Sequence, residues 1–180
     1  ISLNALGRSA DFITCGPITS TAGNISINAG AVGFDDSDIS IDHNLNAGGN
    51  INIVSLGLLS SSVSFSNVTV NAGNNINVLS GAGAASDVTL TDSPFIAGND
   101  VFIAAGAGGA SDVFLTGSPV TAGRDVFILS GAGVTSDVNI GTGSAINATT
   151  GSVTIASGSL INSDVIVSSN ITAATFVDVT

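Results

Sequence analysis

The sequence predicts an all-β fold: a right-handed parallel β-helix, or β-solenoid, of about seven turns with about 25 residues per turn. A regular repeat, short stretches of alternating apolar and polar residues, and the composition all favour this fold. The chain has 180 residues, of which 44% are hydrophobic, and it contains no Glu, Lys, Gln or Met. Because those four residues are strong helix formers, whereas Val, Ile, Thr and Phe favour strands, we expect no long helices.

The repeat is clearest in the middle of the chain. Three similar stretches begin at Ala72 (AGNNINVLSGAGAASDVTL), Ala97 (AGNDVFIAAGAGGASDVFL) and Ala122 (AGRDVFILSGAGVTSDVNI), with a spacing of 25 residues. Farther on, Val153 follows Val126 by 27 residues, which predicts a two-residue insertion near Thr149 and Thr150. One unit cannot bury its own apolar face, but stacked units can, so we expect one solenoid domain over residues 1–180.

Each unit contains three short strands, recognised by alternation with a period of two. The inward positions of the first strand are Ile25/Ile27, Ile51/Ile53, Ile76/Val78, Val101/Ile103, Val126/Ile128 and Val153/Ile155. Those of the second are Ile39/Ile41, Val63/Phe65, Val88/Leu90, Val113/Leu115, Val138/Ile140 and Val165/Val167. The third strand buries one residue before an Ala-Gly or similar pair: Leu45, Val70, Phe95, Val120, Ile146 and Ile171. We expect equivalent strands to stack in parallel ladders roughly 4.8 Å apart.

Small and polar residues separate the strands. Glycines in the Gly-Ala-Gly triplets at 81–83, 106–108 and 131–133 are expected to stack at one corner, where left-handed backbone angles are needed. These triplets resemble a dinucleotide-binding fingerprint, but a strand follows each of them where that fingerprint requires a helix. A further column of short polar residues is expected at Asn75, Asp100 and Asp125.

A column of carboxylates is expected at Asp87, Asp112, Asp137 and Asp164. Like charges about 5 Å apart repel each other by roughly 0.8 kcal/mol per pair in water. Either these side chains cap the turns and face water, or cations lie between them, and Ca²⁺ is the ion that oxygen ligands favour. Otherwise no cofactor is expected. The cluster Asp35, Asp36, Asp38, Asp42 and His43 is a weaker candidate of the same kind.

The charge excludes some classes of function. The formal net charge is −11, with Arg8 and Arg124 as the only Arg or Lys residues, so we expect no nucleic-acid binding. No apolar stretch is long enough for a membrane helix, so no membrane insertion is expected. The outward positions of the first two strands carry no row of carboxylates and bases, and Cys15 has no redox or nucleophilic context. We therefore expect no catalytic residues and no enzyme activity.

Phenylalanines interrupt the polar outward rows. Phe102, Phe114 and Phe127 occupy outward positions on neighbouring turns and predict an apolar surface for self-association. The alternative is that loops cover these rings. The chain also begins and ends on first-strand patterns, at Ile1-x-Leu3 and at residues 176–179. Open strand edges of this kind favour either a segment cut from a longer solenoid or a subunit that stacks end to end.

The three central repeats resemble the β-helical repeats of large secreted bacterial adhesins of the filamentous-haemagglutinin type. This resemblance implies a secreted or cell-surface structural protein that serves adhesion or builds an extracellular matrix such as a biofilm. It implies end-to-end self-assembly as a fibre subunit or adhesin stalk, with a host surface or a polysaccharide as a further partner. The alternative is a β-helix that binds or cleaves polysaccharide, for which a groove lined with aromatic residues and carboxylates would be needed.

Overall fold

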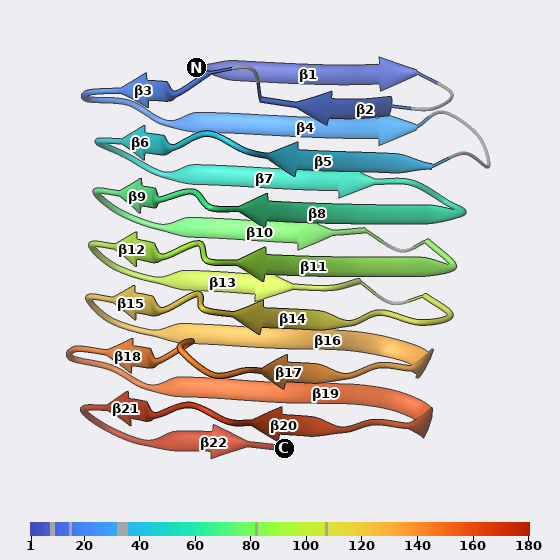
Figure 1. The fold of residues 1–180 in the computed structure, drawn as a ribbon, viewed down its shortest axis with the longest axis vertical. Helices are drawn as coiled ribbons and strands as arrows, with labels where there is room; N and C mark the ends of the chain where they lie inside the picture. The colour runs from blue at the N-terminus through green and yellow to red at the C-terminus, as the bar shows by residue number, and fades with distance from the viewer. Residues whose placement is uncertain (8–9, 15, 32–35, 82, 107) are drawn as a thin grey trace.

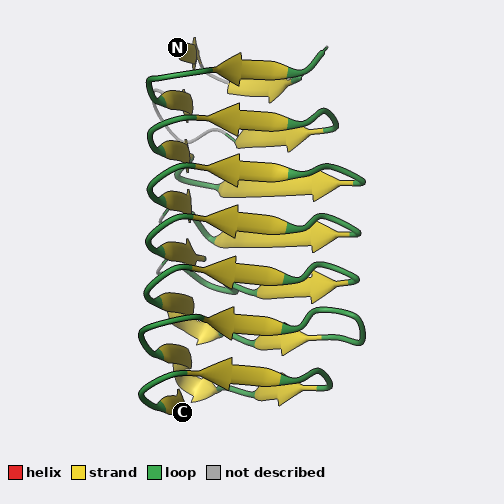
Figure 2. Cartoon of the chain, turned by 90° about the vertical axis from the view of Figure 1, so that its left-hand side faces the viewer, coloured by secondary structure: helices red, strands yellow, loops and turns green. Residues whose placement is uncertain are grey.

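The fold is a β-solenoid of about seven turns, and the computed structural model describes residues 1–7, 10–14, 16–31, 36–81, 83–106 and 108–180. Those residues form 22 strands and no helix. The chain coils downward with a right-handed sense, and its two termini lie at opposite ends of the rod (Figures 1 and 2). The predicted fold class is confirmed.

The first sheet holds the first strand of every turn, in eight parallel strands. They are β1 (Ser2–Gly7), β4 (Ile25–Ala31), β7 (Ile51–Leu56), β10 (Ile76–Ser80), β13 (Val101–Ala104), β16 (Val126–Thr135), β19 (Val153–Asn162) and β22 (Val177–Val179). Val126 pairs with Val153, so the predicted two-residue insertion lies between these strands and leaves the ladder in register.

The other two sheets have seven parallel strands each. The second sheet contains β2 (Ala10–Ile13), β5 (Ser37–Ile41), β8 (Ser60–Ser66), β11 (Ala85–Thr91), β14 (Val113–Thr116), β17 (Val138–Ile140) and β20 (Val165–Val167). The third contains β3 (Ile18–Ser20), β6 (Leu45–Ala47), β9 (Val70–Ala72), β12 (Phe95–Ala97), β15 (Val120–Ala122), β18 (Ile146–Ala148) and β21 (Ile171–Ala173). The first sheet therefore extends one strand beyond the others at the C-terminal end.

The core runs along the axis of the rod and contains the inward residues that the alternation predicts. The central first-strand pairs, such as Ile76/Val78 and Val101/Ile103, are fully buried. Phe65 and Phe95 meet edge to face, with ring centroids 4.9 Å apart, where the second and third sheets converge. Apolar side chains from all three sheets thus fill a continuous column, which no single turn could form.

Buried serines extend the inward rows of the first sheet. Ser55 and Ser80 follow the two apolar inward residues of β7 and β10 and are themselves fully buried. Their hydroxyls donate hydrogen bonds of 2.5 Å to the carbonyls of Ser37 and Ser61 on the second sheet. Because each hydroxyl has a partner, the row of inward-facing side chains continues past the last apolar residue without leaving a polar group unpaired.

The corner glycines are needed for a reason other than the one expected. Gly106 and Gly108 lie outside the left-handed region, so the predicted left-handed angles at these triplets are wrong. A Cβ on either glycine would instead overlap the backbone carbonyl of Gly81 or Gly83 one turn earlier. The central Ala82 and Ala107 lie outside the described residues.

Left-handed residues stack at the corner between the second and third sheets. They are Asn67 (φ 55°), Asp92 (φ 47°), Gly117 (φ 60°) and Gly143 (φ 78°), one on each of four successive turns. Asn, Asp and Gly are the residues that adopt this conformation at least cost. Because Asn, Asp and Gly can all adopt this conformation, the residue changes from turn to turn while the backbone path stays the same.

Candidate self-association surfaces

The predicted column of aspartates lies on the outer side of the second sheet. The backbone N–H of Asp112 donates to Asp87 Oδ1 at 3.1 Å, that of Asp137 donates to Asp112 Oδ1 at 2.9 Å, and that of Asp164 donates to Asp137 Oδ1 at 3.0 Å. Each of these three carboxylates therefore accepts a backbone hydrogen bond from the next turn. This is the kind of capping that short polar side chains provide in turns.

Burial raises the pKa of Asp112 above its ordinary value. The hydrogen bond from the Asp137 backbone opposes this effect, and the neighbouring charges of Asp87 and Asp137 add to it. Within the described part of the chain, no three His, Cys or Asp side chains gather in a way that could hold a metal ion. Ca²⁺ binding along the column stays a prediction.

A second column lies where the third sheet turns into the first. Asn75, Asp100 and Asp125 belong to it, as predicted, and it extends to Asn50 above and Ser152 below. Each backbone N–H donates to the side-chain Oδ1 one turn earlier, at 2.8 to 3.2 Å. Arg124, which is exposed, donates through Nε to Asp100 Oδ1 at 2.8 Å and lies 3.2 Å from Asp125 Oδ2.

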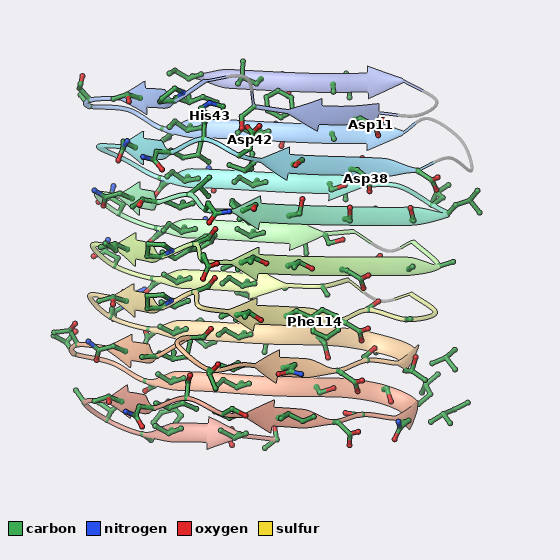
Figure 3. The ribbon with its side chains drawn as sticks, in the orientation of Figure 1. Asp11, Asp38, Asp42, His43 and Phe114 are labelled. Atoms are coloured by element: carbon green, nitrogen blue, oxygen red, sulfur yellow. The ribbon has the colours of Figure 1, made fainter. Side chains whose placement is uncertain are left out.

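The acidic residues near His43 contact different partners. Asp36 accepts from Ser60, and Asp38 accepts from Ser62 one turn away. Asp42 accepts a 2.6 Å hydrogen bond from Thr14 and contacts His43 Nδ1 at 2.7 Å (Figure 3). These contacts, Thr14 first, lower the pKa of Asp42.

Some residues that the sequence analysis names lie outside the described residues. Asp35, Arg8 and Cys15 are among them.

The three phenylalanines predicted for self-association divide between two sheets. Phe102 and Phe127 are neighbours in the first-sheet ladder, with ring centroids 6.5 Å apart. Phe114 lies in the second sheet between Thr89 and Asn139 and is 37% exposed (Figure 3). The structure therefore brings Phe102 and Phe127 together and places Phe114 on another face of the rod.

A second outward row of the first sheet is also apolar, and inspection of the sequence missed it. It contains Val54, Leu79, Ala104, Leu129 and Ala156, which are ladder partners in that order. Ala104 is 6% exposed and forms a low point between Leu79 and Leu129, whose side chains are half-buried. Together with Phe102 and Phe127, this row forms what we call the first-sheet patch.

The first-sheet patch contains no charge. None of the first-sheet strands from β1 to β19 includes an Asp, Arg or His. Asp178 in β22 is the sole charged residue in the strands of this sheet. The patch also continues toward exposed leucines at the corner between the first and second sheets, Leu56, Leu58 and Leu59. A continuous apolar surface on the outer side of a sheet is typical of an interaction site.

No pocket is present among the residues that the structure describes, and no helix there is long and apolar enough to cross a membrane. Comparison with known proteins found no matching protein-family model, no matching curated protein and no matching solved structure.

Proposed function

We propose that this chain is an extracellular structural protein, a β-solenoid rod that serves as a fibre subunit or adhesin stalk and joins further solenoid units end to end. Its role is surface attachment or matrix building, and it acts through its shape and its strand edges, with no catalysis. The repeats similar to those of filamentous-haemagglutinin-type adhesins support the extracellular assignment. The stacking of equivalent coils, in which each strand pairs in parallel with the same strand of the next coil, carries the proposal of assembly.

The lower end of the rod presents unpaired backbone groups. The Phe176 carbonyl accepts from Val153, and the Thr180 N–H donates to the Ile155 carbonyl, so these groups of the last strand face β19. Because successive residues of a strand direct their backbone groups to opposite sides, the N–H and carbonyl groups of Val177 and Val179 face the open edge. Such an edge is a template for another strand.

The core is also exposed at this end. Val177 and Val179 remain 45% and 44% exposed, whereas Val153 and Ile155 directly above them are fully buried. A further coil stacked below β22 would cover both valines, as β22 covers the residues above. Hydrophobic burial and backbone hydrogen bonding therefore favour the same contact.

Negative-stain electron microscopy of the purified chain tests the proposal. We expect filaments that lengthen with protein concentration. Replacing Val179 with proline (Val179→Pro) removes an N–H that faces the open edge and spares the bonds to β19, so this variant should yield short particles.

Val179→Ile is the matched control, since it keeps the N–H and the apolar side chain, and it should still form filaments. Dispersed short particles from the unmodified chain at every concentration would contradict end-to-end assembly.

A further inference from the structure

We propose that the first-sheet patch binds the same patch of a second copy of this chain, with the two rods side by side and antiparallel. The two-fold axis passes between β13 and β16 and runs along the strand direction. This lateral pairing is separate from end-to-end assembly and does not depend on it. Three observations identify a second copy of the chain as the partner: the distribution of charge, the match between facing residues and the available area.

Charge favours this face over the second sheet. Two copies that each carry a net charge of −11 repel each other, so they can approach only where carboxylates are few. The aspartate column of Asp87, Asp112 and Asp137 occupies the outer side of the second sheet. The first-sheet patch, in contrast, lies on strands without charged residues. A second copy of the chain has the same uncharged apolar face to offer in return.

The antiparallel arrangement matches the residues on the two faces. With the axis between β13 and β16, β13 faces β16 of the second copy and β10 faces β19. Phe102 then meets Phe127, Ala104 meets Leu129, and Leu79 meets Ala156. Each small residue of the second outward row thus lies opposite a large one, which favours close packing. The polar Asn77 meets Thr154, so amides and hydroxyls face each other.

The parallel arrangement does not match in this way. A two-fold axis along the rod would place each residue of the first outward row against the second row of the same turn. Asn52 would then face Val54, and Asn77 would face Leu79. An amide buried against an aliphatic side chain without a hydrogen bond is costly. We therefore assign the antiparallel orientation.

The charged residues nearest the patch lie at its edge. Arg124 lies at the corner just before β16, and Asp100 lies at the corner just before β13. Because Val101 pairs with Val126 in the ladder, the proposed axis brings Asp100 of each copy opposite Asp125 of the other, and Arg124 opposite Asn99. The exposed Arg124 guanidinium already contacts Asp100 and Asp125 of its own copy, and it lies beside the facing carboxylates, where its positive charge offsets their repulsion.

The available area is sufficient for reversible pairing. The six strands from β7 to β22, at about 4.8 Å spacing and with about five residues each at 3.3 Å, give a face of roughly 475 Å² per copy, with Asp178 of β22 at its edge. The total of roughly 950 Å² is below the roughly 1,200 Å² at which stable specific interfaces begin and lies in the range of weak, transient ones. We therefore expect a dimer whose population depends on concentration in the micromolar range or above.

Sedimentation equilibrium of the full chain in the Val179→Pro background tests the pairing without interference from filaments. We expect a monomer–dimer equilibrium. Leu129→Asp places a charge in the patch and should raise the dissociation constant at least about tenfold. Ile166→Asp is the matched control, because Ile166 is an exposed outward residue of the second sheet, and it should change the constant less than about twofold.

The double variant Phe102→Ser/Phe127→Ser is a second test of the patch, and it should also raise the dissociation constant of the dimer. Circular dichroism and melting temperature verify that each variant folds. A folded chain that stays monomeric at all concentrations, or a dimer that Leu129→Asp and the double variant both leave intact, would overturn the proposal. Loss of filaments alone leaves it standing, because the dimer is measured with the end blocked.

Disulfide trapping tests the orientation. In a Cys15→Ser background, one chain carries Asn77→Cys and the other carries Thr154→Cys. The antiparallel dimer should trap a mixed disulfide between positions 77 and 154. The parallel arrangement separates these positions by three turns, roughly 14 Å along the rod, so a dimer without this crosslink would overturn the assigned orientation.

Discussion

At the scale of single residues, the solenoid depends on side chains short enough to reach the next turn. The Asp87 and Asp112 carboxylates each accept the backbone N–H of the aspartate below, and Asn50 and Asn75 do the same at another corner. A longer Glu or Gln would extend past these donors. At these corner positions Asp and Asn therefore fit where Glu and Gln would not, and the chain contains neither Glu nor Gln.

The left-handed corner gives a prediction at this scale. Gly117 has φ of 60°, and a Cβ there would meet the Asp92 side chain. Gly117→Ala should therefore lower the free energy of unfolding by about 1–2 kcal/mol, the cost of left-handed backbone for a residue with a Cβ. Chemical denaturation followed by circular dichroism measures the change.

Gly158→Ala is the control for that substitution. Gly158 lies in β19 outside the left-handed region, and the nearest atom to the methyl group that alanine would add, the Ser130 carbonyl oxygen, is 3.8 Å away. We expect a change below about 0.5 kcal/mol. Equal effects of the two substitutions would show that backbone conformation is not what selects glycine at position 117.

At the scale of strands and columns, stacking repeats one environment along the rod and so accumulates like charges. Asp112 has an aspartate above and another below, and its carboxylate is partly withdrawn from water. Folding raises its pKa, so the folded state holds the proton more tightly than the unfolded chain does. Below the ordinary pKa of 3.8 this costs nothing. The destabilisation develops as the pH rises from that value and is complete above the folded pKa.

Asp112→Asn should therefore stabilise the protein at pH 7, by less than about 1 kcal/mol because the site is partly exposed, and should have no effect near pH 3. The amide oxygen keeps the hydrogen bond from Asp137. Thermal melts across this pH range measure the difference. Asp178→Asn, outside the column, is the control, and destabilisation by Asp112→Asn at pH 7 would contradict the role given to burial.

The strands were largely predictable and the patch was not. Pairs such as Ile76/Val78 and Val88/Leu90 alternate with polar residues, and the single residue Phe95 precedes a small pair, so their burial could be inferred. The inward row of β10 continues at Ser80, however, which resembles a turn residue in the sequence. The apolar alternation ends before Leu79, and the outward row containing Leu79 and Leu129 was therefore overlooked. Only the structure shows that a hydroxyl bonded across the core can occupy an inward position.

The corners were harder still to predict. Glycine and asparagine indicate turns in general, but close approach and left-handed backbone are different requirements with the same residue preferences. Gly106 is required because the neighbouring turn approaches closely, and Gly117 is required because its backbone is left-handed. Distinguishing the two requires the distances between turns, which a sequence does not contain.

At the scale of the whole molecule, the chain separates charge from apolar surface. The carboxylate column lies on the second sheet and the first-sheet patch on another face, so repulsion and attraction between copies act on different sides of one rod. If pairing occurs through the patch, added salt should strengthen it, because salt screens the repulsion between two chains of charge −11. Sedimentation between about 20 and 500 mM NaCl measures this, and an association weakened by salt would indicate that ion pairs dominate instead.

The position of the termini at opposite ends of the rod has a mechanical consequence (Figure 1). A pull on both ends acts parallel to the ladder hydrogen bonds, so it opens the coils one after another and never shears several strands at once. Each coil of 25 residues, as set by the pairing of Val101 with Val126, releases up to about 85 Å of extended chain. The rod would thus yield in steps and absorb work under tension.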